Sequence, residues 1–303
     1  MHEVTQTYSP FLYRYYASTG IYLAVAVGGN ATYPDGVWAK GGEFGNAPLF
    51  VGPITKFITP IDPNGGPTGA NNGCFDLSYT DVAGSRIVID YSYSGGITGS
   101  ETVDTLVGNL TTFEGYQARE VSAKTKGTHT ETKTGLSVAV DTENKFYLKR
   151  TGDAETTQYG GVLTANSTQA GFNLTTTSRM VWTPPWVDKQ YGLAIGGSYT
   201  YTQTGTVTMT TGGIPGLPGG PPTTTPVSST QTVKYVGRES VTVPAGTYNA
   251  CKFESKTAGS TDLSTQWVVV GKGVPVKTTT TDAAGKLTQT ISATAVSLNG
   301  QKL

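Results

Sequence analysis

The sequence predicts an all-β protein: a small N-terminal β unit followed by two tandem, diverged modules, each a curled antiparallel sheet that forms half of a barrel. Three observations predict this. The chain of 303 residues carries 40 glycines, and roughly one residue in six is threonine, whose branched Cβ suits a pleated strand. Apolar and hydroxyl side chains alternate with a period of two in several segments. No segment combines the apolar repeat of a helix with helix caps.

Strands are predicted where the alternation is clearest, in residues 87–94, 198–202 and 206–210. Tyrosine, valine and methionine occupy one face of these segments, and threonine and serine occupy the other. Such strands fit an antiparallel sheet with one packed face and one wet face. Residues 211–226 are rich in proline and glycine but lie between two strand-like runs, so they are predicted to form a long, mobile hairpin loop.

An internal repeat organises the larger part of the chain. Residues 107–125 and 236–257 share a Val-Gly pair, a tyrosine, an alanine and a Lys-Thr pair once a three-residue gap is allowed. A Tyr-x-Tyr strand precedes each copy, at Tyr91 and Tyr93 and at Tyr199 and Tyr201.

The repeat sets the predicted domain limits. We expect one β module in residues 74–185 and a second in residues 186–303. A Pro/Gly-rich linker in residues 59–73 would join the first module to an aromatic-rich β unit in residues 1–58.

Charge and hydropathy exclude several partners. The 21 lysines and arginines equal the 21 aspartates and glutamates, which gives no electrostatic reason to expect nucleic acid or an anionic membrane. The longest apolar stretch, residues 21–27, is far shorter than the roughly 18 residues that a spanning helix needs. No membrane span is therefore predicted.

The composition is typical of exported bacterial β proteins, so we expect an extracellular, cell-surface or periplasmic location. The first fifteen residues lack the basic and apolar regions of a signal peptide; the composition is compatible with a mature form that carries an added Met1, and whether Met1 is native stays open. Cys74 and Cys251 fit two states: two buried, inert thiols, or one disulfide that ties the two modules together in an oxidising compartment.

Residues 236–250 read VGRESVTVPAGTYNA and are followed by Trp267 and by GVPVK at residues 273–277. This pattern resembles exported bacterial β proteins of the DUF3108 type over residues 236–299, and the middle third of the chain resembles them weakly. The resemblance implies a relative of the lipoprotein-carrier fold, an incomplete antiparallel barrel curled around an apolar cavity. It carries over no catalytic residue.

Residues 13–25, YRYYASTGIYLAV, are similar to a short YRYY…TGxYLxV hairpin repeat of bacterial surface and secreted proteins. Exposed aromatic side chains in this unit could stack on sugars or on a partner chain. A unit this small also needs most of its aromatic side chains inside to form a core. The candidates for surface exposure are Tyr13, Tyr15, Tyr16 and Trp38.

No catalytic, metal or cofactor site is predicted. The chain contains neither a G-x-S-x-G nor an H-E-x-x-H motif, and two cysteines with two histidines are too few for a metal centre. His129 lies in a polar segment where an exposed bystander is expected. Four acids could in principle pair as in a glycosidase, but turn and edge positions are the expected roles of Asp76, Asp81, Asp90 and Asp104.

Two functions fit these observations. The first is an exported, non-enzymatic structural or interaction protein of the bacterial cell surface or extracellular matrix. It would bind a second copy, as an oligomer or filament, or another surface protein through exposed strand edges. The alternative is a periplasmic carrier or binder of a lipid or other apolar ligand. Its cavity would be lined by Tyr199, Tyr201, Val241, Val243, Phe253 and Trp267.

Overall fold

The computed structural model describes residues 73–303, apart from residues 170–171 and 213–220. In this part of the chain every strand pairs with the next one in the sequence. β1 (Arg86–Gly95) also pairs antiparallel with β12 (Leu287–Leu298). This pairing closes the sheet into a single antiparallel barrel of twelve strands, and the two-residue β13 (Gln301–Lys302) extends the end of β12 as a hairpin.

The remaining strands form an uninterrupted meander between β1 and β12. They are β2 (Ile97–Phe113), β3 (Tyr116–Glu131), β4 (Ser137–Arg150), β5 (Thr156–Gln169), β6 (Phe172–Asp188), β7 (Ser198–Thr211), β8 (Thr223–Val243), β9 (Gly246–Thr257), β10 (Leu263–Val269) and β11 (Pro275–Thr281). Two short 3-10 helices, η2 (Leu77–Asp81) and η3 (Gln190–Gly192), precede β1 and β7. Within the described residues, no helix is long and apolar enough to span a bilayer.

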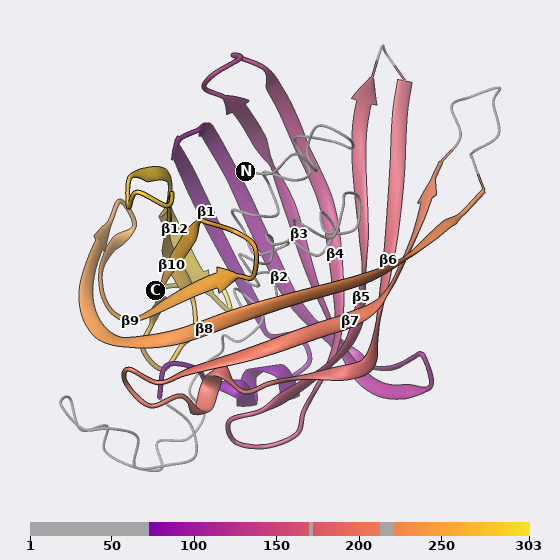
Figure 1. Ribbon diagram of the computed structural model, residues 1–303, viewed down its shortest axis with the longest axis horizontal. Helices are drawn as coiled ribbons and strands as arrows, with labels where there is room; N and C mark the ends of the chain where they lie inside the picture. Colours follow the sequence, from indigo (N-terminus) through magenta and orange to yellow (C-terminus); the bar gives the residue numbers. More distant parts are fainter. Residues whose placement is uncertain (1–72, 170–171, 213–220) are drawn as a thin grey trace.

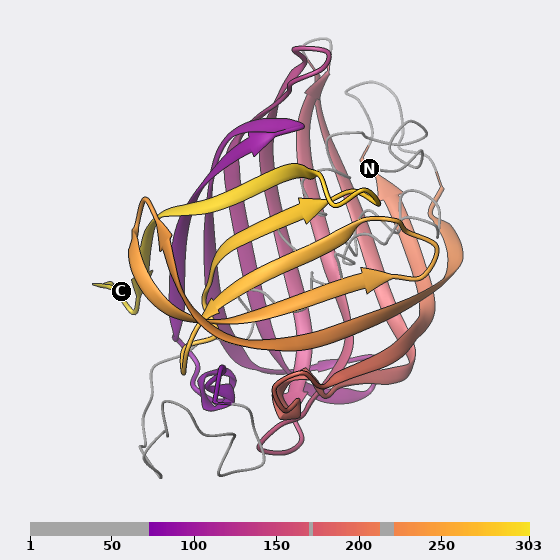
Figure 2. The same cartoon turned by 60° about the vertical axis from the view of Figure 1, so that its left-hand side comes forward.

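The barrel is flattened into two crossed layers. In Figure 1 the strands from β1 to β6 run steeply, whereas β7 and β8 cross in front of them. Figure 2 shows the later strands, coloured orange to yellow, lying across the earlier ones. Two sheets that cross in this way bury the facing side chains between them.

The prediction of two separate half-barrel modules is wrong. β6 pairs with β7 and β12 pairs with β1, so the two halves complete one barrel and share one core. The predicted boundary after residue 185 falls inside β6. On its own, the first half would lose the partners of β1 and β6, and the second half would lose the partners of β7 and β12. The predicted N-terminal unit and residues 59–72 of the predicted linker, with Tyr13, Tyr15, Tyr16 and Trp38, lie outside the described residues.

The strand predictions and the assignment of their two faces are confirmed. In β1 the side chains of Ile87, Ile89, Tyr91 and Tyr93 are buried and alternate with more exposed ones. On the outer face, hydroxyl groups pair across strands, as between Thr202 and Thr230 at 2.7 Å. The predicted hairpin after β7 is also present, but β8 already begins at Thr223, so the loop is shorter than residues 211–226.

The repeated Val-Gly pair marks a β-bulge in each half of the barrel. The register between β2 and β3 shifts between Val107 and Leu110, and the register between β8 and β9 shifts between Tyr235 and Gly237. A bulge leaves a residue unpaired and bends the strand. We call the two hairpin ends beyond the bulges the first arm (residues 110–119) and the second arm (residues 237–252).

The first arm packs on the outside of the barrel. Its Phe113 stacks on Tyr147 at a centroid distance of 4.1 Å, and its Tyr116 stacks on Tyr159 at 4.6 Å. Tyr147 alternates with the buried Phe146 and Leu148, so it stands on the outer face. The bulge thus gives this arm a small apolar cluster of its own, separate from the main core.

Each half also begins with a turn in which an aspartate side chain accepts a hydrogen bond from the backbone amide two residues later. Asp76 Oδ1 accepts a hydrogen bond from the Ser78 amide at 3.0 Å, and Asp188 Oδ1 accepts one from the Gln190 amide at 3.1 Å. A fully buried tyrosine follows three residues after each aspartate, Tyr79 and Tyr191. The spacing D-x-x-Y recurs in the sequence and supports the duplication.

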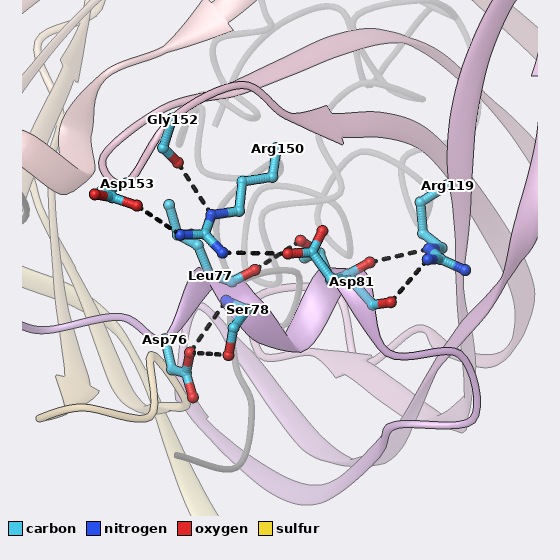
Figure 3. Close-up of polar contacts among 9 residues, drawn as sticks. Asp76, Leu77, Ser78, Asp81, Arg119, Arg150, Gly152 and Asp153 are labelled. Carbon is cyan, nitrogen blue, oxygen red and sulfur yellow. Dashed lines mark hydrogen bonds and ion pairs between the residues drawn. The ribbon is translucent and has the colours of Figure 1, made fainter. Parts of the chain in front are cut away.

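The first of these turns is fixed to the wall by two arginines (Figure 3). Arg119 donates to the Asp81 carbonyl at 2.8 Å, and Arg150 pairs with the Asp81 carboxylate at 3.2 Å. On the outer face, Asp90 accepts from Thr102 and Asp104 pairs with Arg86. The expectation of turn and edge roles for the four acids is confirmed.

Candidate functional site

A buried polar centre lies on the inner face of the first three strands. Glu101 of β2 and His129 of β3 are each 3% exposed, and His129 Nε2 lies 3.3 Å from Glu101 Oε2. The Tyr93 hydroxyl of β1 donates to Glu101 Oε1. The Tyr93 and His129 rings are 4.3 Å apart. We call these three residues the acid–histidine centre. The expectation that His129 is an exposed bystander is wrong, because the register of β3 turns this side chain inward.

A glycine opposite Glu101 makes room for the carboxylate. Gly127 of β3 pairs directly with Glu101. A Cβ at Gly127 would lie only 2.6 Å from both Cα and Cβ of Glu101, closer than any ordinary contact. The same Cβ would lie still closer to the backbone oxygen of Ser100, so a side chain at Gly127 would force the paired backbones of β2 and β3 apart around Glu101.

Next to this centre, three neighbouring strands carry buried polar atoms that have no hydrogen-bond partner in the described structure. They are the hydroxyls of Thr105, Thr125 and Thr142 and both amide atoms of Asn144. Each of the four residues is at most 2% exposed. Native proteins leave few such groups unsatisfied, because each costs about 1–3 kcal/mol. We call these four residues the inner polar row.

The register places the inner polar row in one continuous patch. Thr105 of β2 and Asn144 of β4 pair with Ala123 of β3 from either side. Thr125 of β3 and Thr142 of β4 pair directly with each other. Ala123 is fully buried and has the smallest side chain in the group. The patch is therefore low in the middle and bordered by hydroxyl and amide groups.

Apolar side chains border the row on the same face. Val103 pairs with Thr125, and Leu163 pairs with Asn144. Val121 and Phe146 form the next pair along β3 and β4. All four are at most 3% exposed and belong to the main core. The inner wall thus places a compact polar patch within an apolar surface.

A second polar centre surrounds Asp188, at the end of β6. Its Oδ1 accepts from the Gln190 amide and from the Tyr199 hydroxyl at 2.9 Å. Its Oδ2 accepts from Gln190 Nε2 and from the Tyr191 hydroxyl, both at 2.8 Å. The four bonds hold η3 and the start of β7 against the barrel wall. This carboxylate is fully occupied and serves as a structural anchor.

Asp188 should give the fold a measurable pH dependence. Burial raises the pKa of this carboxyl above its ordinary 3.8, and the four hydrogen bonds oppose the rise. As pH increases, the unfolded chain ionises first, so the native state holds more protons and loses stability until pH passes the raised pKa. We expect the stability of the wild type relative to Asp188→Asn to fall as pH rises above the ordinary pKa of 3.8 and to level off once pH passes the raised pKa, as measured by urea denaturation. A constant or growing difference would contradict this assignment.

The six residues predicted to line a cavity lie on two different faces. Tyr201 donates to Gln231 inside the barrel, and the half-buried Tyr199 stacks on it at 5.1 Å. Phe253 packs on Tyr235 in the core at 4.8 Å. These three face inward.

Of the other three residues, Val241 and Val243 belong to the second arm, and Trp267 lies in the neighbouring strand β10. Lys252 and Lys277 pair with Trp267 from either side, and their ammonium groups lie 5.3 and 5.2 Å from its ring. The register places Val241 and Val243 on the same face as Lys252. The bulge at Gly237 shifts the inward–outward alternation of β8 by one residue. Val241 and Val243 therefore lie on the face of the sheet opposite to Phe253. The predicted residues are therefore divided between two faces of the sheet, although all six belong to or pack against the same buried cluster.

The cysteines are joined. Cys74 and Cys251 form a disulfide with a Cα–Cα distance of 5.9 Å, so of the two predicted states the bonded one is found. Both residues are fully buried. In the part of the chain that the structure describes, no group of three or more His, Cys, Asp and Glu side chains is arranged to hold a metal ion.

Comparisons with known proteins identify no family. No family model matches the chain, and no curated protein sequence matches it. A solved structure that matches is described as a "putative exported protein with YmcC-like fold" from Bacteroides fragilis. It is 11% identical, the match covers 71% of this chain and 96% of that chain, and the TM-score is 0.28. A likeness of this degree carries no argument, so the function must be inferred from the residues.

Proposed function

We propose that the protein is an exported, non-enzymatic binding protein that holds a small amphiphilic ligand inside its barrel. The observation that carries the proposal is the inner polar row, four buried residues with unsatisfied polar atoms that lie beside the acid–histidine centre and are bordered by apolar side chains. A bound ligand with a polar group would supply the missing hydrogen bonds. The ligand would lie between the two layers of the twelve-stranded barrel, against the inner faces of β2, β3 and β4.

Two further features support export and ligand binding. A buried disulfide persists in an oxidising compartment and is rare in the cytosol. The outer face is rich in paired threonine hydroxyls, which suit contact with water. The resemblance of residues 236–299 to the DUF3108 type, and through it to lipoprotein carriers, adds the expectation of an apolar ligand.

Self-assembly through strand edges has less support. That function needs strands whose backbone groups are free to pair with another chain. The pairing of β1 with β12 leaves only the two-residue β13 at the margin of the described sheet. Ligand binding is therefore the better proposal.

Native mass spectrometry of the full chain, purified from an oxidising compartment without detergent, tests the proposal. We expect a one-to-one complex with a small amphiphile that organic extraction releases. As a control, Thr202→Val, which changes only a hydroxyl on the outer face, should keep the ligand. A ligand-free protein that also fails to bind added single-chain amphiphiles would contradict the proposal.

A further inference from the structure

We infer that the ligand carries a neutral headgroup with hydroxyl or amide groups, and that Thr105, Thr125, Thr142 and Asn144 bind this headgroup. The inference rests on the proposed function and specifies the chemical class of the ligand. Its starting point is the kind of atom left unsatisfied: three hydroxyl oxygens, one amide nitrogen and one amide oxygen.

The hydrogen-bonding capacity of the row favours a head that both donates and accepts. Each threonine hydroxyl can donate one hydrogen bond and accept others, and the Asn144 amide donates through Nδ2 and accepts through Oδ1. A carboxylate or phosphate head only accepts at neutral pH, so it would leave the Asn144 oxygen without a donor. A glycerol, sugar or amide head satisfies both ends of the amide.

The distribution of buried charged residues also favours a neutral headgroup. Among the described residues, no lysine or arginine side chain is buried, so an anionic head at the inner polar row would meet no buried lysine or arginine. The buried carboxyl group of Glu101 lies on the same face of β2 as Thr105 and Val103. An anionic head would compete with Glu101 for His129, which already lies 3.3 Å from that carboxyl group, and this is disfavoured in a medium of low polarity.

The surroundings also provide for the apolar part of the ligand. Val103, Val121, Phe146 and Leu163 border the row on the inner face. A single alkyl chain attached to the head would lie along these side chains. Because burial of apolar surface is the main driving force for binding an alkyl chain, the chain would supply most of the affinity and the row would supply the selectivity.

Three single-chain amphiphiles of equal chain length test the inference on the full chain. They are monolaurin, whose head is neutral glycerol, laurate and dodecyl phosphate, titrated by calorimetry at pH 8. We expect monolaurin to bind at least ten times more tightly than either anion, because the anions leave a polar group unpaired and approach Glu101.

Matched threonine variants locate the head. Thr142→Val replaces an unsatisfied inner hydroxyl by a methyl group and should weaken monolaurin binding about threefold to tenfold. Because this hydroxyl has no partner in the described structure, the variant should fold at least as stably as the wild type. Thr202→Val makes the same change on the outer face and should leave affinity unchanged.

The outcomes separate the inference from the proposed function. Equal affinity for monolaurin and laurate, or full affinity in Thr142→Val, would overturn the neutral-head inference while leaving a ligand-binding barrel. Failure of all three amphiphiles to bind would remove the proposed function and the inference together.

Discussion

Replacing Asp188 by alanine is expected to lower the free energy of unfolding by about 3–5 kcal/mol. The carboxylate is 1% exposed and accepts four hydrogen bonds, from Gln190 twice and from Tyr191 and Tyr199 once each. Without it, four donors would lose a common acceptor at the junction of the two barrel layers. Urea denaturation followed by tryptophan fluorescence measures the change.

Asp104→Ala is the matched control, since it removes an aspartate whose ion pair with Arg86 lies on the exposed outer face. The pair is bidentate and partly exposed, so the control should lose about 1 kcal/mol, much less than Asp188→Ala. Similar losses in Asp104→Ala and Asp188→Ala would show that the anchor assigned to Asp188 is wrong.

Removing the disulfide should have the second large effect, a loss of about 2–5 kcal/mol in the free energy of unfolding. The bond joins residues 177 positions apart, so its absence releases a long loop in the unfolded chain. It also attaches the segment before η2 to β9, in the opposite half of the barrel. The double variant Cys74→Ala with Cys251→Ala should therefore unfold at a lower urea concentration than the oxidised wild type.

Reduction provides an independent check of the same bond. Dithiothreitol should lower the unfolding midpoint of the wild type toward that of the double variant, and it should leave the double variant unchanged. An oxidised wild type with the same midpoint as the double variant would contradict the predicted contribution of the disulfide.

The strands themselves could be predicted from the sequence, because alternation is a local property. Tyr91 and Tyr93 face inward beside hydroxyl residues that face outward, as the period of two requires. The duplication was also visible, and the structure gives it a physical basis in two bulges and two D-x-x-Y turns. Closure was not visible, since the pairing of β1 with β12 joins residues about 200 positions apart, as Ser92 and Ser292 do.

The inner polar row was missed because a rule that holds elsewhere in the chain fails there. Threonine and serine were assigned to the wet face, and most follow that rule. Thr105, Thr125 and Thr142 lie at inward positions among apolar neighbours instead. The signal was the alternation in residues 101–107. Thr105 occupies the same face as Val103 and Val107, which are apolar, so it should have been assigned to the inner face. Breaks in local consistency of this kind are expected at functional or strained sites.

The central claim is that one closed barrel encloses a ligand against the inner faces of β2, β3 and β4. Photocrosslinking tests it most directly, with a monoacylglycerol that carries a diazirine on its acyl chain and peptide mass spectrometry to map the adducts. The account predicts adducts on inward side chains such as Val103, Val121 and Phe146. Adducts confined to outward neighbours such as Lys124 and Lys145, or spread over the two arms, would contradict it.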